Sequence, residues 1–292
     1  MQLCNRLLQM TGNSLYADYM ETAIYNALMA SLKADASQIA KYSPLEGWRH
    51  EGEEQCGMHI NCCNANGPRA FAMIPQFAYQ VQDDCVRVNF YAPSEAELVL
   101  PGKKPVRLKQ TTDYPRTDQI EIEVDPAKET AFTIALRIPA WSKIAVVSVN
   151  GQPQDGVLQG AYLPVNRKWK KGDRITVKLD LRARLVERNQ AQAIVRGPIV
   201  LARDSRFGDG FVDEASVVVS KDGYVALTPV KAPGFAWLAF TAPMVLGTDL
   251  ESNRAPKQIH FCDFASAGNT WDKTQRYRVW LPKTLNVMHS PY

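Results

Sequence analysis

The stretch DQIEIEVD, residues 118–125, decides the fold class of this 292-residue chain. Ile120, Ile122 and Val124 alternate with acidic residues, which is typical of a strand with one face on a core and the other in water. Further stretches beyond residue 80 share this character: CVRVNFYAP, TAFTIALRIPAW, IAVVSVNG, DRITVKLDLRARLV and AIVRGPIVLAR. Together they predict an antiparallel β-sandwich.

Turn signals separate these strands. Asn150-Gly151 is a strong hairpin signal because both residues tolerate a positive φ, and KKGD at 170–173 predicts a second turn. The signal weakens from about residue 206, where we expect strands separated by polar loops in YVALTPV, FAWLAFTAPMVL and RYRVWLP.

The first 80 residues have a helical period instead. Leucines and methionines in residues 1–12 predict a helix that stops at Gly12, and residues 13–35 predict a second helix capped by Asn13 or Ser14. A third helix is predicted to begin at Pro68, with a kink at Pro75. The fold class is therefore α+β and multidomain: helices in 1–80, a β-sandwich in 81–205 and a β-rich region in 206–292.

Composition excludes several classes of protein. The formal net charge is only +4 and the basic residues are scattered, so we predict no nucleic-acid partner. No apolar run approaches the roughly 18 residues that a membrane span needs, and the first residues do not form a secretory signal. We expect a soluble protein, and the sequence leaves open whether it lies in the cytoplasm or the periplasm.

The stretch HINCCNANGPRA, residues 59–70, holds the adjacent pair Cys62 and Cys63 just before a predicted helix. Adjacent Cα atoms are about 3.8 Å apart, which is below the usual disulfide range. Two thiolates can turn more easily toward one soft metal ion such as Zn²⁺. The alternative is a pair of inert buried cysteines, which are common in protein cores.

Neighbouring residues extend this hypothesis. Cys56 and His59 are candidates for further ligands, although a histidine near a loop often makes ordinary hydrogen bonds. The acidic run EGEEQC offers Glu51, Glu53 or Glu54 as a general acid, or simply forms a solvated loop face. The remaining cysteines are interpreted as packing residues.

An ordered series of motifs resembles glycoside hydrolase family 127, the β-L-arabinofuranosidase group. The helical part carries LCNRLLQMTGNSLYADYMETAIYNALMA, YSPLEG and QCGMHINCCNANGPRA. The later part carries LRIPAWS, VSVNGQ, GAYLPVNRKWKKGDRITVKLDL and RGPIVLARD. The resemblance covers roughly residues 1 to 205, and the series is specific although each motif alone is weak.

The resemblance implies an (α/α)6 barrel joined to β-sandwich domains, of which residues 1–80 would be part of the barrel. It implies a retaining glycosidase whose nucleophile is a zinc-bound cysteine. On this sequence Cys62 would be the nucleophile and a zinc ligand, and Cys63 a further zinc ligand. Tyr42, in YSPLEG, matches a tyrosine near the sugar, and His59 is a second candidate for substrate binding. The substrate would be a plant-type glycan or oligosaccharide.

The sequence also departs from the family pattern. In the family a glutamate and three cysteines hold the zinc, and the Glu-x-Cys element and the acid/base glutamate precede the stretch that matches residues 1–8. Two of the expected zinc ligands and the acid therefore have no match here, and we expect a truncated chain with little activity alone. One alternative is a carbohydrate-binding or structural module, with Trp141, Tyr162, Trp169 and Trp271 as candidate stacking residues, although core packing is favoured for Trp141 and Trp169. Another is a zinc- or redox-responsive regulator.

Overall fold

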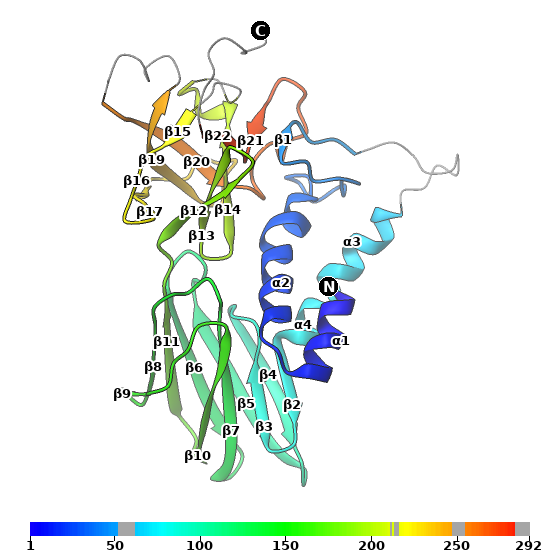
Figure 1. The fold of residues 1–292 in the computed structure, drawn as a ribbon. Coiled ribbons are helices and arrows are strands. Elements are labelled where there is room, and N and C mark those ends of the chain that lie inside the picture. The colour runs from blue at the N-terminus through cyan, green and yellow to red at the C-terminus, as the bar shows by residue number, and fades with distance from the viewer. Residues whose placement is uncertain (52–61, 211, 213–215, 247–254, 284–292) are drawn as a thin grey trace. The chain divides into compact units, whose positions relative to one another are not determined.

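The computed structural model describes residues 1–51, 62–210, 212, 216–246 and 255–283. The chain divides into two compact units, and each includes two separate parts of the sequence. The first unit contains Met1–Thr22 and Ala70–Leu181, and the second contains Ala23–Arg69 and Arg182–Tyr292. Many more of the described residues lie in strands than in helices (Figure 1).

The helices of the first unit confirm part of the sequence prediction. The bounds are α1 Gln2–Thr11, α2 Leu15–Ala23 (whose last residue falls in the second unit) and α4 Ile74–Ala78. Gly12 ends α1 in the left-handed conformation at φ 65°, as predicted for a glycine after the last helical turn. The backbone N–H of Leu15 donates to the Asn13 side chain over 3.0 Å, so Asn13 caps the start of α2.

Two sheets form the β part of the first unit (Figure 1). One has the order β10-β7-β3-β2, and the other has the order β4-β5-β6-β11-β8-β9. The strands are β2 Tyr79–Gln82, β3 Cys85–Val88, β4 Ser94–Leu100, β5 Lys104–Thr112, β6 Gln119–Pro126, β7 Thr130–Ile138, β8 Ala145–Val149, β9 Gln152–Pro153, β10 Ala161–Trp169 and β11 Asp173–Leu179.

The core of this unit has the predicted period. Ile120, Ile122 and Val124 on β6 are fully buried, so the alternation in residues 118–125 predicted the strand and its inner face correctly. Asn150 and Gly151 have φ values of 51° and 79°, which confirms the hairpin turn between β8 and β9. The pairing is antiparallel except between β3 and β7, which run parallel. The prediction of a purely antiparallel sandwich was wrong at this pair.

The second unit holds a 12-stranded sheet whose main path is β15-β19-β20-β14-β13-β12-β17-β16. The main-path strands are β12 Ala183–Arg188, β13 Ala191–Arg196, β14 Ile199–Asp204, β15 Ser216–Val218, β16 Ser220–Lys221, β17 Tyr224–Val225, β19 Ala239–Leu246 and β20 Lys257–Asp263. Short strands join off this path: β1 Glu46–Gly47, β18 Thr228–Pro229, β21 Tyr277–Arg278 and β22 Leu281–Pro282.

In this unit the π-helical turn η1 Ile24–Leu28 continues from α2. Helix α3 Cys63–Ala72 begins here, and its last residues fall in the first unit. The short 3-10 turn η2 spans Ser205–Phe207. The predicted start of the third helix at Pro68 was wrong, because α3 begins at Cys63 and Pro68 lies inside it. Proline is most often found in the first turn of a helix, and here Pro68 lacks the backbone N–H that would otherwise donate to the carbonyl four residues earlier. The helix breaks at Met73, near the kink predicted at Pro75.

Among the described residues, no helix combines the length and the apolar character that crossing a bilayer requires.

Candidate functional site

The cysteine pair lies where α3 begins. Cys62 is exposed in the turn before the helix, and Cys63 is the half-buried first helical residue. The backbone N–H groups of Ala65 and Asn66 donate to the Cys62 carbonyl over 3.2 and 3.0 Å, so Cys62 closes the first turn. The amino end of a helix favours negative charge, so a thiolate is better tolerated here than in a helix interior. The interpretation of the pair as deeply buried packing residues does not hold for Cys62.

The two thiols interact with each other. A side-chain hydrogen bond joins Cys63 to Cys62, and the Cys63 Sγ lies 4.0 Å from the Lys41 carbonyl oxygen. Burial raises the pKa of Cys63, and its neighbour Cys62 raises it further, whereas the positive charge of Lys41 lowers it. Ionisation of the Cys63 thiol is therefore disfavoured by burial and by Cys62, and favoured by Lys41.

A close backbone approach holds α3 in place. A methyl group added at Gly67 would lie 2.4 Å from the Ile39 Cδ1, so the Ile39 side chain would have to shift to admit a larger residue there. The Ile39 segment is itself tied down, because the Ala40 N–H donates to the Ser31 carbonyl over 2.6 Å. The helix that carries the cysteines is thus seated against residues 39–41.

Tyr42 follows Lys41 directly. Its side chain is 65% exposed, so the ring is available to a ligand, and the Lys41 amine lies 5.3 Å from the ring centroid. The Lys41 N–H donates to the Glu51 carbonyl over 3.1 Å and closes residues 41–51 into a loop. The structure therefore brings Lys41 and the cysteine pair together, with Tyr42 as the next residue in the chain.

Several predicted residues lie outside the described part of the chain: Glu53, Glu54, Cys56 and His59. Glu51 is described and exposed. Within the described residues no group of three or more histidine, cysteine, aspartate or glutamate side chains is placed to hold a metal ion. None of the five cysteines that are described forms a disulfide.

The other three cysteines were interpreted as packing residues. Cys262 is fully buried, and Cys4 and Cys85 are half-buried. Burial raises the pKa of Cys262 and of Cys85, which keeps both thiols neutral.

The aromatic residues of the carbohydrate-binding alternative have structural contacts. Trp169 is fully buried, and its indole N–H donates to the Phe132 carbonyl over 3.0 Å. The Trp141 indole donates to Glu21 over 3.3 Å, and the Tyr162 hydroxyl donates to the Asn89 side chain over 2.5 Å. A sugar cannot stack on a tryptophan that the core covers completely, so Trp169 is not a binding residue.

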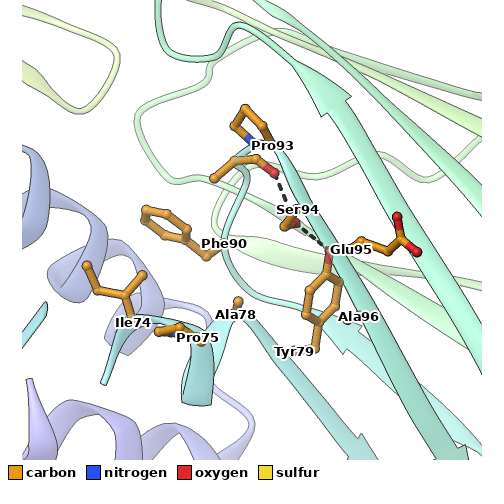
Figure 2. A pocket seen from close by; sticks show the side chains of 10 residues that line it. Ile74, Pro75, Ala78, Tyr79, Phe90, Pro93, Ser94, Glu95 and Ala96 are labelled. Atoms are coloured by element: carbon orange, nitrogen blue, oxygen red, sulfur yellow. Dashed lines mark hydrogen bonds between the residues drawn. The ribbon is translucent and has the colours of Figure 1, made fainter. Parts of the chain in front are cut away.

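The first unit contains a cavity of about 270 Å³ between α4 and the start of β4 (Figure 2). Its lining is mostly apolar, with Ile74, Pro75 and Phe90 among the residues around it. The Tyr79 hydroxyl lies 2.9 Å from the Ser94 hydroxyl at its polar side. None of the predicted site residues lines this cavity.

Sequence reasoning missed Arg49. Its side chain is fully buried in the second unit although it lies in a polar, glycine-containing stretch. Burial lowers the pKa of Arg49, an effect that the nearby Tyr277 opposes. An arginine in such a loop is ordinarily read as solvent-exposed, and only its position next to Trp48 hinted at partial burial.

Two models of family domains match the chain. Residues 1–76 match the GH127 β-L-arabinofuranosidase catalytic domain, and residues 85–181 match the GH127 middle domain. The cysteine pair, Lys41 and Tyr42 fall in the first match, and the strands β3 to β11 fall in the second.

Known proteins agree with these matches. The chain is 26% identical over 222 residues to the non-reducing end β-L-arabinofuranosidase of Bifidobacterium longum subsp. longum, which covers 67% of this chain and 32% of that protein. A solved GH127 β-arabinofuranosidase superposes with a TM-score of 0.82 at 25% identity, covering 99% of this chain and 48% of the other.

A GH127 β-L-arabinofuranosidase from Geobacillus stearothermophilus T6 has the same fold, with a TM-score of 0.79 at 22% identity, covering 96% of this chain and 48% of that one. The chain thus spans about half the length of these solved relatives, and it resembles glycosidases along both matched domains. Together the two domain matches and the relatives show that the chain belongs to glycoside hydrolase family 127.

Proposed function

We propose that Cys62 and Cys63 form part of a retaining glycosidase centre that acts on β-L-arabinofuranosides. The observation that supports this best is the pair of interacting thiols at the amino end of α3, inside the stretch that matches the GH127 catalytic domain. The substrate class rests on the curated relative, which is a non-reducing end β-L-arabinofuranosidase. A plant-type glycan would be the natural source of this sugar.

The donor set fits part of a zinc site. Zn²⁺ prefers sulfur and nitrogen ligands in a four-coordinate arrangement, and two thiols in contact can supply two of the four positions. Cys62 and Cys63 would hold the ion on this chain. When bound, zinc would keep the Cys62 sulfur ionised at neutral pH and stabilise it as a leaving group.

The chemistry follows the retaining scheme. The Cys62 sulfur attacks the anomeric carbon while the glycosidic C–O bond breaks, and a general acid gives its proton to the leaving oxygen. Water, deprotonated by the same group, then attacks the anomeric carbon and the sulfur leaves. Two inversions at one carbon give net retention. Tyr42 would contact the sugar through its exposed ring, and we assign His59 to the same role.

The family pattern has a glutamate and three cysteines around the zinc, and only Cys62 and Cys63 match it on this sequence. We therefore propose that the 292-residue chain by itself binds zinc weakly and turns over arabinofuranosides slowly or not at all. Residues 1–80 would belong to a partial (α/α)6 barrel, followed by a sandwich domain in 81–205 and a β-rich region in 206–292.

The test combines zinc binding with hydrolysis of a chromogenic β-L-arabinofuranoside. Competition with a chromophoric chelator should show weak zinc binding that Cys62→Ser and Cys63→Ser each abolish, while Cys4→Ser leaves it unchanged. Turnover should stay near background even with added zinc. Robust turnover would overturn the proposed inactivity, and zinc binding that survives both substitutions would overturn the proposed ligands.

A further inference from the structure

The second unit contains a buried arginine that the chemistry above does not use. The Arg49 guanidinium is fully buried and makes hydrogen bonds to the carbonyl oxygens of Ala30, Ala265 and Phe264. The bonds to Ala30 and Ala265 measure 2.9 and 2.8 Å. Its Nε donates to the Tyr277 hydroxyl over 3.4 Å. The planar guanidinium can donate to several oxygens at once in fixed directions, which the single amine of a lysine cannot do.

Aromatic rings cover the faces of the same group. The guanidinium carbon lies 4.7 Å from the centre of the Phe264 ring and 5.0 Å from that of Tyr277. A buried cation without compensation is costly, so these rings and carbonyl oxygens leave little freedom for Arg49 to move.

The loop before Arg49 is fastened to β21. The Tyr277 hydroxyl donates to the Pro44 carbonyl over 2.6 Å, and the Val279 N–H donates to the Leu45 carbonyl over 2.9 Å. Strand β1, Glu46–Gly47, pairs antiparallel with β21. Residues 44–49 are therefore held by β21 and by the segment 264–265, which both lie more than 200 residues further along the sequence.

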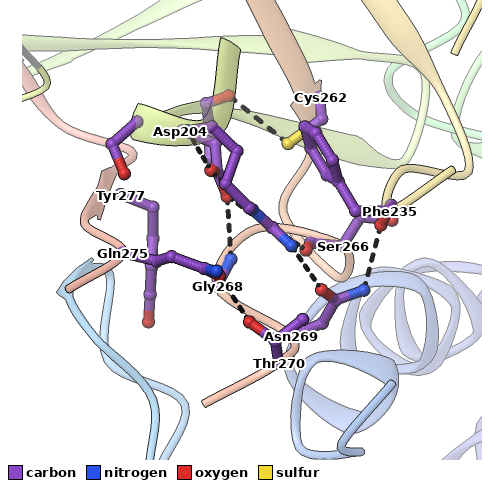
Figure 3. Close-up of polar contacts among 12 residues, drawn as sticks. Asp204, Phe235, Cys262, Ser266, Gly268, Asn269, Thr270, Gln275 and Tyr277 are labelled. Atoms are coloured by element: carbon purple, nitrogen blue, oxygen red, sulfur yellow. Dashed lines mark hydrogen bonds and ion pairs between the residues drawn. The ribbon is translucent and has the colours of Figure 1, made fainter. Parts of the chain in front are cut away.

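A polar network stabilises the segment that receives Arg49 (Figure 3). The buried Asp204 carboxylate accepts from the Gly268 N–H over 2.9 Å and pairs with Arg206 over 2.6 Å. Arg206 also donates to the Ser266 carbonyl and to the Asn269 side chain, each over 2.9 Å. These bonds fix residues 266–269, which directly follow the Phe264 and Ala265 carbonyls that hold Arg49.

The other end of the loop reaches the cysteines. The Lys41 N–H is bonded to the Glu51 carbonyl, and the Lys41 carbonyl lies 4.0 Å from the Cys63 Sγ. Because the Lys41–Glu51 bond closes the loop, holding residues 44–49 also restrains Lys41. The Lys41 carbonyl next to Cys63 and the following residue, Tyr42, are restrained with it. We infer that Arg49 and Tyr277 are positioning residues, which hold loop 41–51 so that Lys41 and Tyr42 stay beside the Cys62–Cys63 pair.

The catalytic meaning of this inference rests on the proposed function, but its test does not. Tyr277→Phe removes the hydroxyl that joins Arg49 to Pro44 and keeps the ring in place. We expect amide exchange at Lys41 and Val279, and alkylation of Cys63 by iodoacetamide, to become about fivefold faster, the factor that matches one hydrogen bond of typical net strength. Cys85, in the first unit, serves as the internal reference and should keep its alkylation rate.

Tyr114→Phe is the matched control, because it deletes another buried tyrosine hydroxyl, the one that donates to Glu21 over 2.8 Å in the first unit. It should lower the melting temperature without changing the alkylation of Cys63. Unchanged alkylation in Tyr277→Phe, or an equal rise in Tyr114→Phe, would overturn the positioning role. Neither readout needs zinc or turnover, so a failure of the zinc and hydrolysis assays would count only against the proposed function.

The wild-type chain gives a second measurement if Tyr277→Phe does not fold. In low concentrations of urea, alkylation of Cys63 and amide exchange at Val279 should accelerate together, because both require loop 41–51 to leave β21. Alkylation that responds to urea independently of Val279 would contradict the inference.

Discussion

Loss of the Arg137 side chain should strongly destabilise the first unit. It is fully buried on β7, and its guanidinium pairs with Asp18 and with Glu21, the latter over 2.7 Å. Its Nε also donates to the Asn89 carbonyl over 2.7 Å. Burial alone would lower the pKa of Arg137, but Glu21 and Asp18 outweigh burial and hold it well above its ordinary value. The arginine therefore stays charged across the whole accessible pH range.

Replacing Arg137 by methionine keeps the apolar stem and removes the charge. Glu21 is completely buried and Asp18 nearly so, which leaves two carboxylates without their cation. Removing one partner of a buried ion pair costs about 3–5 kcal/mol, so we expect a loss in this range from the free energy of unfolding. A typical domain has a total of only about 5–15 kcal/mol, and the first unit would become marginal.

Urea denaturation followed by circular dichroism, with amide exchange at Ile134 and Leu136 to report on the first unit, measures this loss. Arg174→Met is the control, because its partner Glu121 is 37% exposed and an exposed pair contributes about 1 kcal/mol or less. Adding Glu21→Gln to Arg137→Met should restore part of the stability, since one of the two unpaired charges disappears. A loss no larger than that of Arg174→Met would refute the reasoning.

Three further predictions concern other contacts. The hydrogen bond from Arg107 lowers the pKa of the Asp125 carboxyl, so the pair stabilises the fold above the unfolded pKa near 3.8, and this gain disappears as pH falls through the lower folded value. Asp125→Asn should therefore flatten the acid limb of a stability–pH curve, and an unchanged slope would count against the pair. Overpacking of Gly67→Ala against Ile39 should cost about 1–3 kcal/mol, and the better helix propensity of alanine should return about 1 kcal/mol, so we expect a net loss of up to about 2 kcal/mol. Ile39→Val should recover part of this loss in thermal melts, and an equal effect of Gly67→Ala in both backgrounds would contradict the contact. Trp169→Ala should cost about 3–5 kcal/mol as a core truncation, measured by urea denaturation, and a loss of less than about 1 kcal/mol would contradict its role in the core.

The strands of the first unit were predictable because their signal is local. The alternation of Ile120, Ile122 and Val124 predicts a buried strand face from five residues, and Asn150-Gly151 predicts the turn that it forms. The start of α3 was less predictable, because proline at position 68 is a common sign of a first turn, whereas the helix had already begun at Cys63. Local rules favour a proline over a cysteine as the first residue of a helix. The packing of Gly67 against Ile39, which accompanies the earlier start, is not visible in the sequence.

The candidate site was predictable only as a list of residues. The pair Cys62 and Cys63 stands out by its rarity, and the family resemblance added Tyr42. The support of that site was not predictable, because Arg49 meets Tyr277 across 228 residues of sequence. A contact over that separation leaves no periodic or compositional trace near either residue, so only the structure reveals it.

The parallel pairing of β3 with β7 has a consequence for how the first unit can be divided. Strands that run parallel cannot be joined by a hairpin, and here the connecting chain forms β4, β5 and β6 of the opposite sheet. The chain therefore passes from one sheet to the other and back, and cutting the gene between Leu100 and Thr130 would divide the strands of both sheets between the two fragments. Fragment complementation and circular permutation should accordingly succeed or fail for the sandwich as a whole.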